Sequence, residues 1–404
     1  MLASLLLAVL PLSGHEDPDL LTLTDGKEIE CRVLLEDDQH VVYRTGRKTQ
    51  EIARDQVRSV QSVERSLEQF VERFAAIDPT QVAALSDLAL FAESSYLPGE
   101  ATNTWIRILT LDPENEQAWT KLGGIKRRKG WELKVRGRFL DIGELRTRVS
   151  DWKNALELRT AHFLIQTDAA PELALDASLD LERAWLTFYR ILGKPLGLYV
   201  FDEVPEVHVY SDAKDYPSPP TPGQSAWFSR AANTLHVDRS SQPNRGQVVA
   251  ELVDALVLNA FRRTLDKRTG ELEPWAREGL RQAFAGAVRP DPGRVRFDFD
   301  TPLAPFFRAQ VTDPKPLKLE QVLRAGLASF DSGTDAARYQ AQSYTLTHFL
   351  VFADDGKYRQ RYAEFLRTSY EGKGGSSNFF KVLGLDPDEA QAEWTAYVTR
   401  LAGG

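Results

Sequence analysis

The sequence predicts an α+β fold in which short strands precede a long helical part. Apolar and polar residues alternate over residues 206–210, as in a half-buried strand. From about Trp275 onward, apolar residues recur instead at helical spacing. The chain has 404 residues, of which 42% are hydrophobic and 27% charged. This length and composition favour two or three folded domains, each with its own core.

The N-terminus resembles a secretion signal. Residues 5–10 form an unbroken apolar run followed by Pro11, too short to span a bilayer, which needs about 20 apolar residues. We therefore predict a signal peptide at residues 1–14, export to the periplasm or the cell exterior, and no transmembrane anchor in the mature chain. No basic residue precedes the run, so a cytoplasmic chain with an apolar N-terminus stays open. Cys31 is the only cysteine and cannot decide the compartment.

Residues 20–63 predict a small antiparallel β module. Strand-forming residues occur in 21–29, on both sides of Asp25-Gly26, and in 31–35 and 41–44. The pairs Asp25-Gly26 and Asp37-Asp38 mark turns between them, and Asp-Gly is a strong hairpin signal.

Residues 64–150 predict a helical connector. Residues 104–123 resemble the junction of two tetratricopeptide units, in which Asp112-Pro113 starts the second helix pair and Trp119, Leu122 and Gly123 supply packing positions. Only one junction is visible, whereas about three repeats are needed for a solenoid that stands alone. We therefore predict a connector that packs on its neighbours; the alternative is an independent peptide-binding array.

The next segments predict a sheet followed by a buried helix. Residues 162–167 and 206–210 are expected strands, and residues 171–192 an expected helix between them. Residues 226–229 and 234–238 predict a hairpin at the sheet edge that would wall a substrate cleft. A turn-prone stretch at 240–246 leads into a predicted helix from Gln247 to about Arg263.

Within this helix, residues 250–254 contain the pattern AExxD, with Ala250, Glu251 and Asp254. In the zinc-peptidase motif HExxH, two histidines at i and i+4 lie on one helix face and bind Zn²⁺, while the glutamate polarises the metal-bound water. Here Ala250 and Asp254 occupy the two histidine positions. A methyl group has no lone pair to donate to a metal.

Two later segments strengthen the comparison. Residues 274–280, PWAREGL, are similar to the P-x-W-x-x-E-G-x-A/L signature of gluzincin-type peptidases, and Glu278 follows Asp254 by 24 residues. Residues 339–350, beginning with Tyr339, are similar to the Y-x-Q-S-x-x-L-x-x-F-L helix of the same group. Residues 155–404 therefore resemble the peptidase-MA-like family of bacterial gluzincins, as a degenerate member with both catalytic histidines replaced.

The resemblance implies a zincin-like fold: a small twisted sheet, the active-site helix and a helical C-terminal part. It implies a vestigial site of Ala250, Glu251, Asp254 and Glu278, where Glu251 holds the general-base position and Glu278 that of the third zinc ligand. We predict no metal and no cofactor. Asp254 and Glu278 are a poor start for Ca²⁺, which takes six or more oxygens. Trp275 and Tyr339 are cleft-lining candidates, although Tyr339 is equally compatible with a packing role.

Three functions follow. The leading one is a catalytically inactive pseudopeptidase that binds a peptide or protein partner in the cell envelope, in part by strand addition at the sheet edge. The alternative is a hydrolase that acts without zinc through the carboxylates Glu251 and Glu278. The third is a purely structural role in an envelope assembly. The net charge of −8 argues against nucleic acid as a partner, because phosphate binding requires clustered positive charge.

Overall fold

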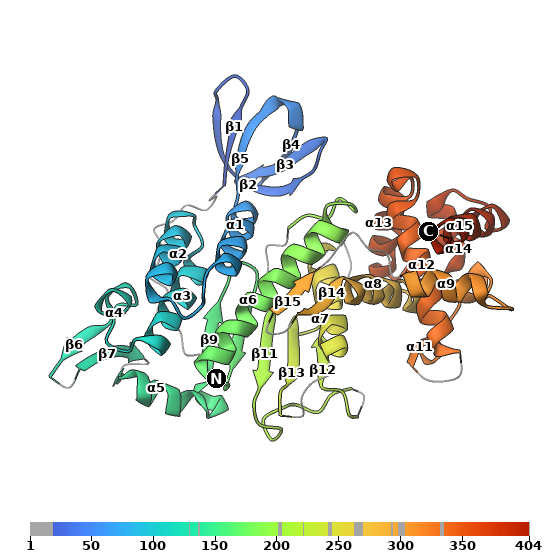
Figure 1. Cartoon of the computed structure of the whole chain (residues 1–404). Coiled ribbons are helices and arrows are strands. Elements are labelled where there is room, and N and C mark those ends of the chain that lie inside the picture. Colours follow the sequence, from blue (N-terminus) through green and yellow to red (C-terminus); the bar gives the residue numbers. More distant parts are fainter. Residues whose placement is uncertain are drawn as a thin grey trace. The chain divides into compact units, whose positions relative to one another are not determined.

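The computed structural model describes residues 19–403 except 129, 136–137, 201–203, 221, 241–244, 262–269, 292–293, 298–303 and 332–334. The predicted signal peptide at 1–14 lies outside the described residues. The fold is mixed α+β with small sheets, in agreement with the class that the sequence predicts (Figure 1). None of the described helices is both long enough and apolar enough to cross a lipid bilayer.

The chain divides into two compact units. Unit 1 comprises residues 1–186 and 202–248, and unit 2 comprises residues 187–201 and 249–404. This boundary falls inside the predicted domain of residues 155–404: its strands between residues 156 and 238 belong to unit 1, whereas its elements after residue 249 belong to unit 2.

Unit 1 begins with the β module. Its five strands are antiparallel in the order β4-β3-β2-β1-β5 and span β1 Asp19–Leu23, β2 Glu28–Glu36, β3 His40–Thr45, β4 Lys48–Ala53 and β5 Val57–Gln61. The predicted turn joins β1 to β2, where Gly26 adopts a φ of +86° and Asp25 Oδ1 accepts a hydrogen bond from the Lys27 backbone N–H. Leu21 and Cys31 are fully buried in the core of this module.

The helical connector is shorter than predicted. It consists of α1 Val63–Ala76, α2 Val82–Ser94, α3 Pro98–Leu111 and the six-residue α4 Glu116–Lys121. Three short strands then form an antiparallel sheet, namely β6 Ile125–Arg127, β7 Gly130–Val135 and β8 Arg138–Leu140, before α5 Ile142–Val149. The prediction of a helical segment from 64 to 150, with a second helix pair after Asp112-Pro113, is therefore wrong where β6, β7 and β8 lie. The strands pair through their backbones while Trp131 stacks on Trp119 with ring centroids 6.2 Å apart.

The second sheet of unit 1 contains the predicted strands. Its order is β12-β13-β11-β10-β9, with β9 Leu156–Arg159, β10 Leu164–Thr167, β11 Glu206–Tyr210, β12 Ala226–Ser229 and β13 Thr234–Asp238. Strands β10, β11 and β13 are parallel, and α6 Pro171–Phe188 makes the crossover from β10 to β11. The predicted hairpin β12–β13 lies at the sheet edge, and Asn233 takes the left-handed conformation in its turn.

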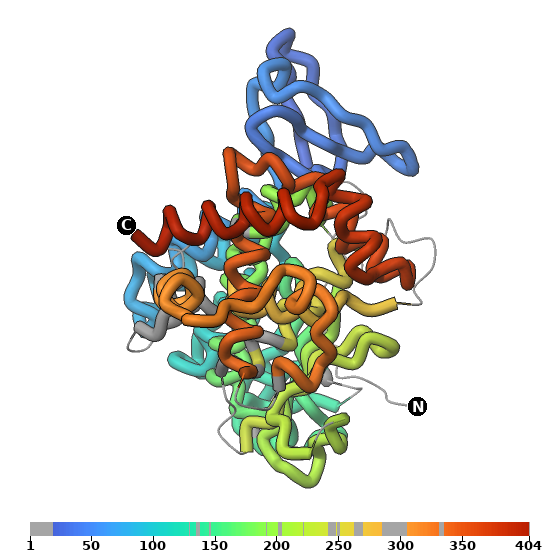
Figure 2. The backbone as a smooth tube through the Cα atoms, turned by 90° about the vertical axis from the view of Figure 1, so that its right-hand side faces the viewer, coloured from blue at the N-terminus to red at the C-terminus, as the bar shows by residue number. Residues whose placement is uncertain are grey.

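Unit 2 is built mainly from helices. They are α7 Arg245–Phe261, α8 Pro274–Ala287, α9 Ala304–Thr312, α10 Leu319–Leu323, α11 Ala328–Asp331, α12 Ala336–Phe352, α13 Arg359–Tyr370, α14 Ser376–Leu383 and α15 Pro387–Ala402. The last helix, α15, lies on the outside of this unit with the C-terminus at its free end (Figure 2). A hairpin of β14 Val288–Asp291 and β15 Arg294–Phe297 interrupts the helices, so the prediction of purely helical structure after Trp275 is wrong here.

Helix α8 packs closely against α12 because residue 279 has no side chain. A Cβ atom added to Gly279 would clash with Thr347 Oγ1 and with the carbonyl oxygen of Ser343 on α12. The glycine of the PWAREGL segment is thus a packing residue that lets the two backbones approach.

We expect Gly279→Ala to lower the free energy of unfolding by about 1–3 kcal/mol, because the backbone of α12 would have to move. Gly326→Ala is the matched control in the same unit, since a Cβ there meets no atom within 4 Å. It should change stability by less than about 0.5 kcal/mol. Urea unfolding of the three proteins measures both effects, and equal midpoints for the two variants would contradict the close packing.

Candidate functional site

Helix α7 carries two buried carboxylates of the predicted vestigial site. Every residue from Glu251 to Phe261 is buried, as expected for a helix that is apolar on most faces. Glu251 and Asp254 are three positions apart and therefore share one helix face. Their side chains are only 7% and 4% exposed. Two buried negative charges require compensation by positive partners.

Two arginines of α8 provide this compensation. Arg277 and Arg281 are four positions apart, so both extend from one face of α8. Arg277 Nε donates a hydrogen bond to Asp254 Oδ2. Arg281 Nη2 donates to Glu251 Oε1 at 2.7 Å and to Asp254 Oδ2 at 3.0 Å. Glu251, Asp254, Arg277 and Arg281 form what we call the Arg–carboxylate cluster.

The cluster fixes the charge of its central arginine. Burial opposes the positive charge of Arg281, but the carboxylates of Asp254, Glu251 and Glu278 outweigh it and raise the pKa of Arg281 above its usual value. A weaker contact of 3.8 Å between Arg277 Nη2 and Glu251 Oε1 completes the network. Two positive and two negative groups therefore balance within the cluster.

Glu278 lies beside the cluster but forms its hydrogen bond elsewhere. It follows Arg277 directly, so its side chain leaves α8 about 100° away around the helix axis. Gln282 Nε2, one turn later, donates to Glu278 Oε1 at 2.7 Å. Glu278 is near enough to contribute to the pKa of Arg281. The structure thus unites Glu251 and Asp254 directly, with Glu278 at the margin; the side chain of Ala250 lies outside the described part.

This arrangement limits the chemistry of the site. A zinc ion needs three protein ligands with free lone pairs and an open fourth position. Within the residues that the structure describes, no group of three or more His, Cys, Asp or Glu side chains is arranged to hold a metal ion. Asp254 Oδ2 accepts hydrogen bonds from both arginines, and Arg281 holds Glu251 Oε1. A general base must be free to take a proton from a substrate or water, whereas Glu251 is held in an ion pair.

The two predicted cleft residues have different surroundings. Trp275 is 1% exposed and packs among the rings of Tyr362, Phe365 and Phe379. It therefore belongs to the core of unit 2, and its assignment to a cleft wall is wrong, because an indole so fully enclosed by rings has no face left for a ligand. Tyr339 is partly exposed and meets the Phe330 ring edge to face at 5.6 Å, which agrees with the packing alternative.

A separate cluster of aromatic side chains lies on the second sheet of unit 1. His208 and His236 face each other on neighbouring strands, with ring centroids 5.4 Å apart. Trp152 stacks near Tyr210 and Trp227 stacks on His236. Burial lowers the pKa of His208, and it lowers that of His236 to about 4, so both rings are neutral at neutral pH. These rings pack against each other, which gives both histidines a packing role on this sheet.

The arginines of the cluster are the site residues that sequence analysis missed. Their i, i+4 spacing in a segment that also carries Glu278 was the available signal. No protein-family model matches the sequence, and a search of curated proteins finds no significant match.

Proposed function

We propose that this protein is a catalytically inactive relative of the gluzincin-type peptidases that binds a peptide or protein partner in the cell envelope. The Arg–carboxylate cluster carries the proposal: at the positions where a gluzincin would hold zinc, two guanidinium groups neutralise Glu251 and Asp254. The order of elements along the chain, a small sheet followed by α7, α8 and α12, agrees with a zincin-like fold. In this proposal residues 1–14 are the signal that directs export.

The cluster also bears on the hydrolase alternative. A carboxylate pair acting on a glycosidic bond needs one protonated and one ionised group about 5–9.5 Å apart, both facing the substrate. Glu251 is instead 5% exposed and held by Arg281. Within the described part of the chain, neither the ion pair of Glu251 with Arg281 nor the hydrogen bond of Glu278 with Gln282 favours that mechanism, so we retain the non-catalytic role alone.

Purified protein tests the proposal directly. We expect elemental analysis after dialysis to find no stoichiometric zinc, and fluorogenic peptide substrates to remain uncleaved. The immobilised mature chain should retain peptides from a random library, because the proposal assigns it a binding role. One zinc per chain, together with proteolysis that a chelator abolishes, would overturn the non-catalytic role; retention of no peptide would overturn the binding role.

Rebuilding the metal site tests whether Ala250 and Asp254 correspond to the two histidines of the HExxH motif. Ala250→His with Asp254→His should bind zinc poorly, because Arg277 and Arg281 would place two positive charges beside the metal. We expect zinc binding only when Arg277→Ala and Arg281→Ala are added. The zinc affinity of the variant with all four substitutions should be about 10–100-fold below that of a native site, since the groups that orient the ligands are missing.

Isothermal titration with zinc measures this difference. Glu278→Ala, added to the fourfold variant, is the control and should abolish zinc binding. If the variant with all four substitutions is folded but takes up no zinc, α7 does not correspond to the HExxH helix.

A further inference from the structure

A row of buried charged side chains runs through unit 1. Arg32 donates hydrogen bonds to Asp19 Oδ2 at 3.2 Å and to Glu64 Oε1 at 2.6 Å. His162 follows, with Nε2 3.8 Å from Glu64 Oε1 and Nδ1 2.8 Å from Glu182 Oε2. Each cation of this row therefore lies between two carboxylates. We call these five residues the buried charge row.

A further carboxylate stands next to the end of the row. Glu100 is 4% exposed, and its Oε1 accepts a hydrogen bond from the Ala161 backbone N–H at 2.8 Å. Its other oxygen, Oε2, is buried and has no hydrogen-bond partner among the described residues. Burial, reinforced by repulsion from Glu182, raises the pKa of Glu100 to about 7. With Glu100, the region holds four carboxylates against the two cations of the row, so positive charge is in deficit.

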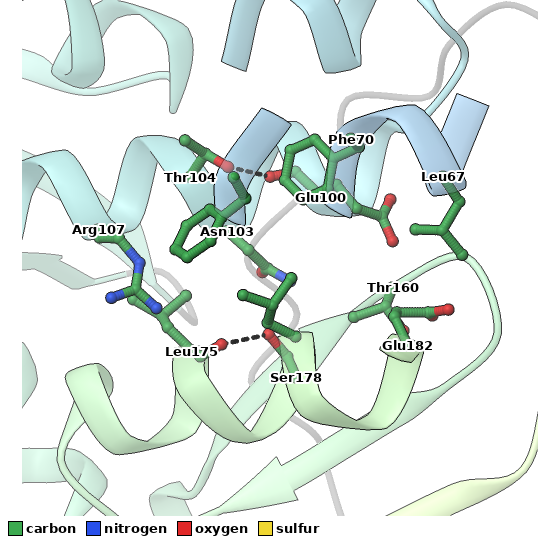
Figure 3. A pocket seen from close by; sticks show the side chains of 12 residues that line it. Leu67, Phe70, Glu100, Asn103, Thr104, Arg107, Thr160, Leu175, Ser178 and Glu182 are labelled. Atoms are coloured by element: carbon green, nitrogen blue, oxygen red, sulfur yellow. Dashed lines mark hydrogen bonds between the residues drawn. The ribbon is translucent and has the colours of Figure 1, made fainter. Parts of the chain in front are cut away.

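Glu100 lines a narrow pocket between α1, α3 and α6. The cavity measures about 30 Å³, within about 370 Å³ of empty space that includes its open mouth. Apolar side chains form much of the wall, namely Leu67, Phe70, Phe74, Leu175 and Leu179. Figure 3 shows the acidic groups of Glu100 and Glu182 at one end of this pocket and Arg107 at the other. The pocket is therefore small, apolar along much of its wall and acidic at one end.

We propose that this pocket binds a primary ammonium group carried on a short alkyl chain, with Glu100 Oε2 as its acceptor. An ammonium supplies both the missing charge and the missing N–H donor. The apolar wall suits the methylene groups of the ligand, whereas Ca²⁺ would need six or more oxygen ligands and Mg²⁺ would keep several waters. All residues of the site lie in unit 1, so the inference is independent of the peptidase resemblance of unit 2.

Two sources present this chemistry: a free alkylamine, and the lysine side chain of a partner peptide. Both place an ammonium at the end of a flexible methylene chain. The lysine source would connect the pocket with the partner-binding role proposed above, but the site itself requires only the amine.

Titration calorimetry of the full chain with n-butylammonium chloride tests the proposal. We expect saturable one-to-one binding at pH 8 that weakens about tenfold at pH 6, where Glu100 is largely protonated and must release its proton. n-Butanol, of similar shape but uncharged, should not bind. Glu100→Gln should weaken amine binding at least tenfold. Glu116→Gln, which removes a carboxylate of the same unit that is 70% exposed, should leave it unchanged.

A second variant keeps the test decisive if Glu100→Gln does not fold. Ser178→Leu fills the pocket from α6 while it retains Glu100, and it should also weaken amine binding at least tenfold. The proposal would be overturned if the folded natural chain did not bind butylammonium. It would also be overturned if both folded pocket variants bound butylammonium as tightly as the natural chain does. A capped Gly-Lys-Gly peptide, compared with Gly-Gln-Gly, separates the two sources: selective binding of the lysine peptide assigns a peptide ligand, and binding of butylammonium alone assigns a free amine.

Discussion

Arg281→Ala should lower the free energy of unfolding of the protein by about 3–5 kcal/mol, the usual cost of removing one partner from a buried ion pair. Arg281 donates to both Glu251 and Asp254, whose side chains are 7% and 4% exposed. Without it, Arg277 alone would face two buried carboxylates. Urea unfolding and differential scanning calorimetry of the full chain measure the loss.

Two comparisons separate the lost ion pair from a general effect of truncating arginine. Arg324→Ala removes an arginine that pairs with Glu320 on the surface of the same unit, with side chains 67% and 55% exposed. It should cost less than about 0.5 kcal/mol. The variant Glu251→Gln, Asp254→Asn, Arg281→Met should recover much of the stability, because it leaves no carboxylate unpaired. A loss for Arg281→Ala as small as that for Arg324→Ala would show that the cluster is not a buried ion-pair network.

His162→Gln should produce a loss of similar size that depends on pH. The side chain of His162 is 2% exposed and stacks on Trp185 with ring centroids 3.5 Å apart. Burial alone would lower the pKa of His162, but the carboxylates of Glu182 and Glu64 outweigh it and raise the pKa to about 9. The folded protein therefore binds the imidazolium proton more tightly than the unfolded chain does, whose histidine pKa is about 6.5.

The sign follows from the direction of this shift. The contribution of the charged imidazole is complete below about pH 6.5 and is lost as the pH rises through about 9. The stability gap between the natural chain and His162→Gln should thus shrink by about 3 kcal/mol over that interval. Urea unfolding at pH 6, 7.5 and 9 measures it. His40→Gln, at a histidine that is 47% exposed, is the control and should change stability by less than about 0.5 kcal/mol. A constant gap for His162→Gln would mean that the buried ring is uncharged.

Local pattern was enough to locate several elements. Alternation of apolar and polar residues predicted β11, and helical spacing predicted α6 and α7 close to their observed bounds, whereas α8 and α12 were expected from the family resemblance. The segment that forms β6–β8 was missed because the basic run at 126–129 resembles a helix end. The conformation of this segment depends on pairing between strands and on the contact of Trp131 with Trp119. Neither can be recognised from one short stretch of sequence.

For the candidate site, the sequence determined which side chains share a face, because helix periodicity alone places Glu251 with Asp254 and Arg277 with Arg281. Only the tertiary structure decided that these two faces meet. Asp254 and Arg277 are 23 residues apart in the chain, and no local sequence pattern determines that they come into contact. The same holds for His162, which lies between carboxylates 20 residues after it and far before it in the chain. Charges of opposite sign can be buried only together, and the packing of the helices determines which of them come together.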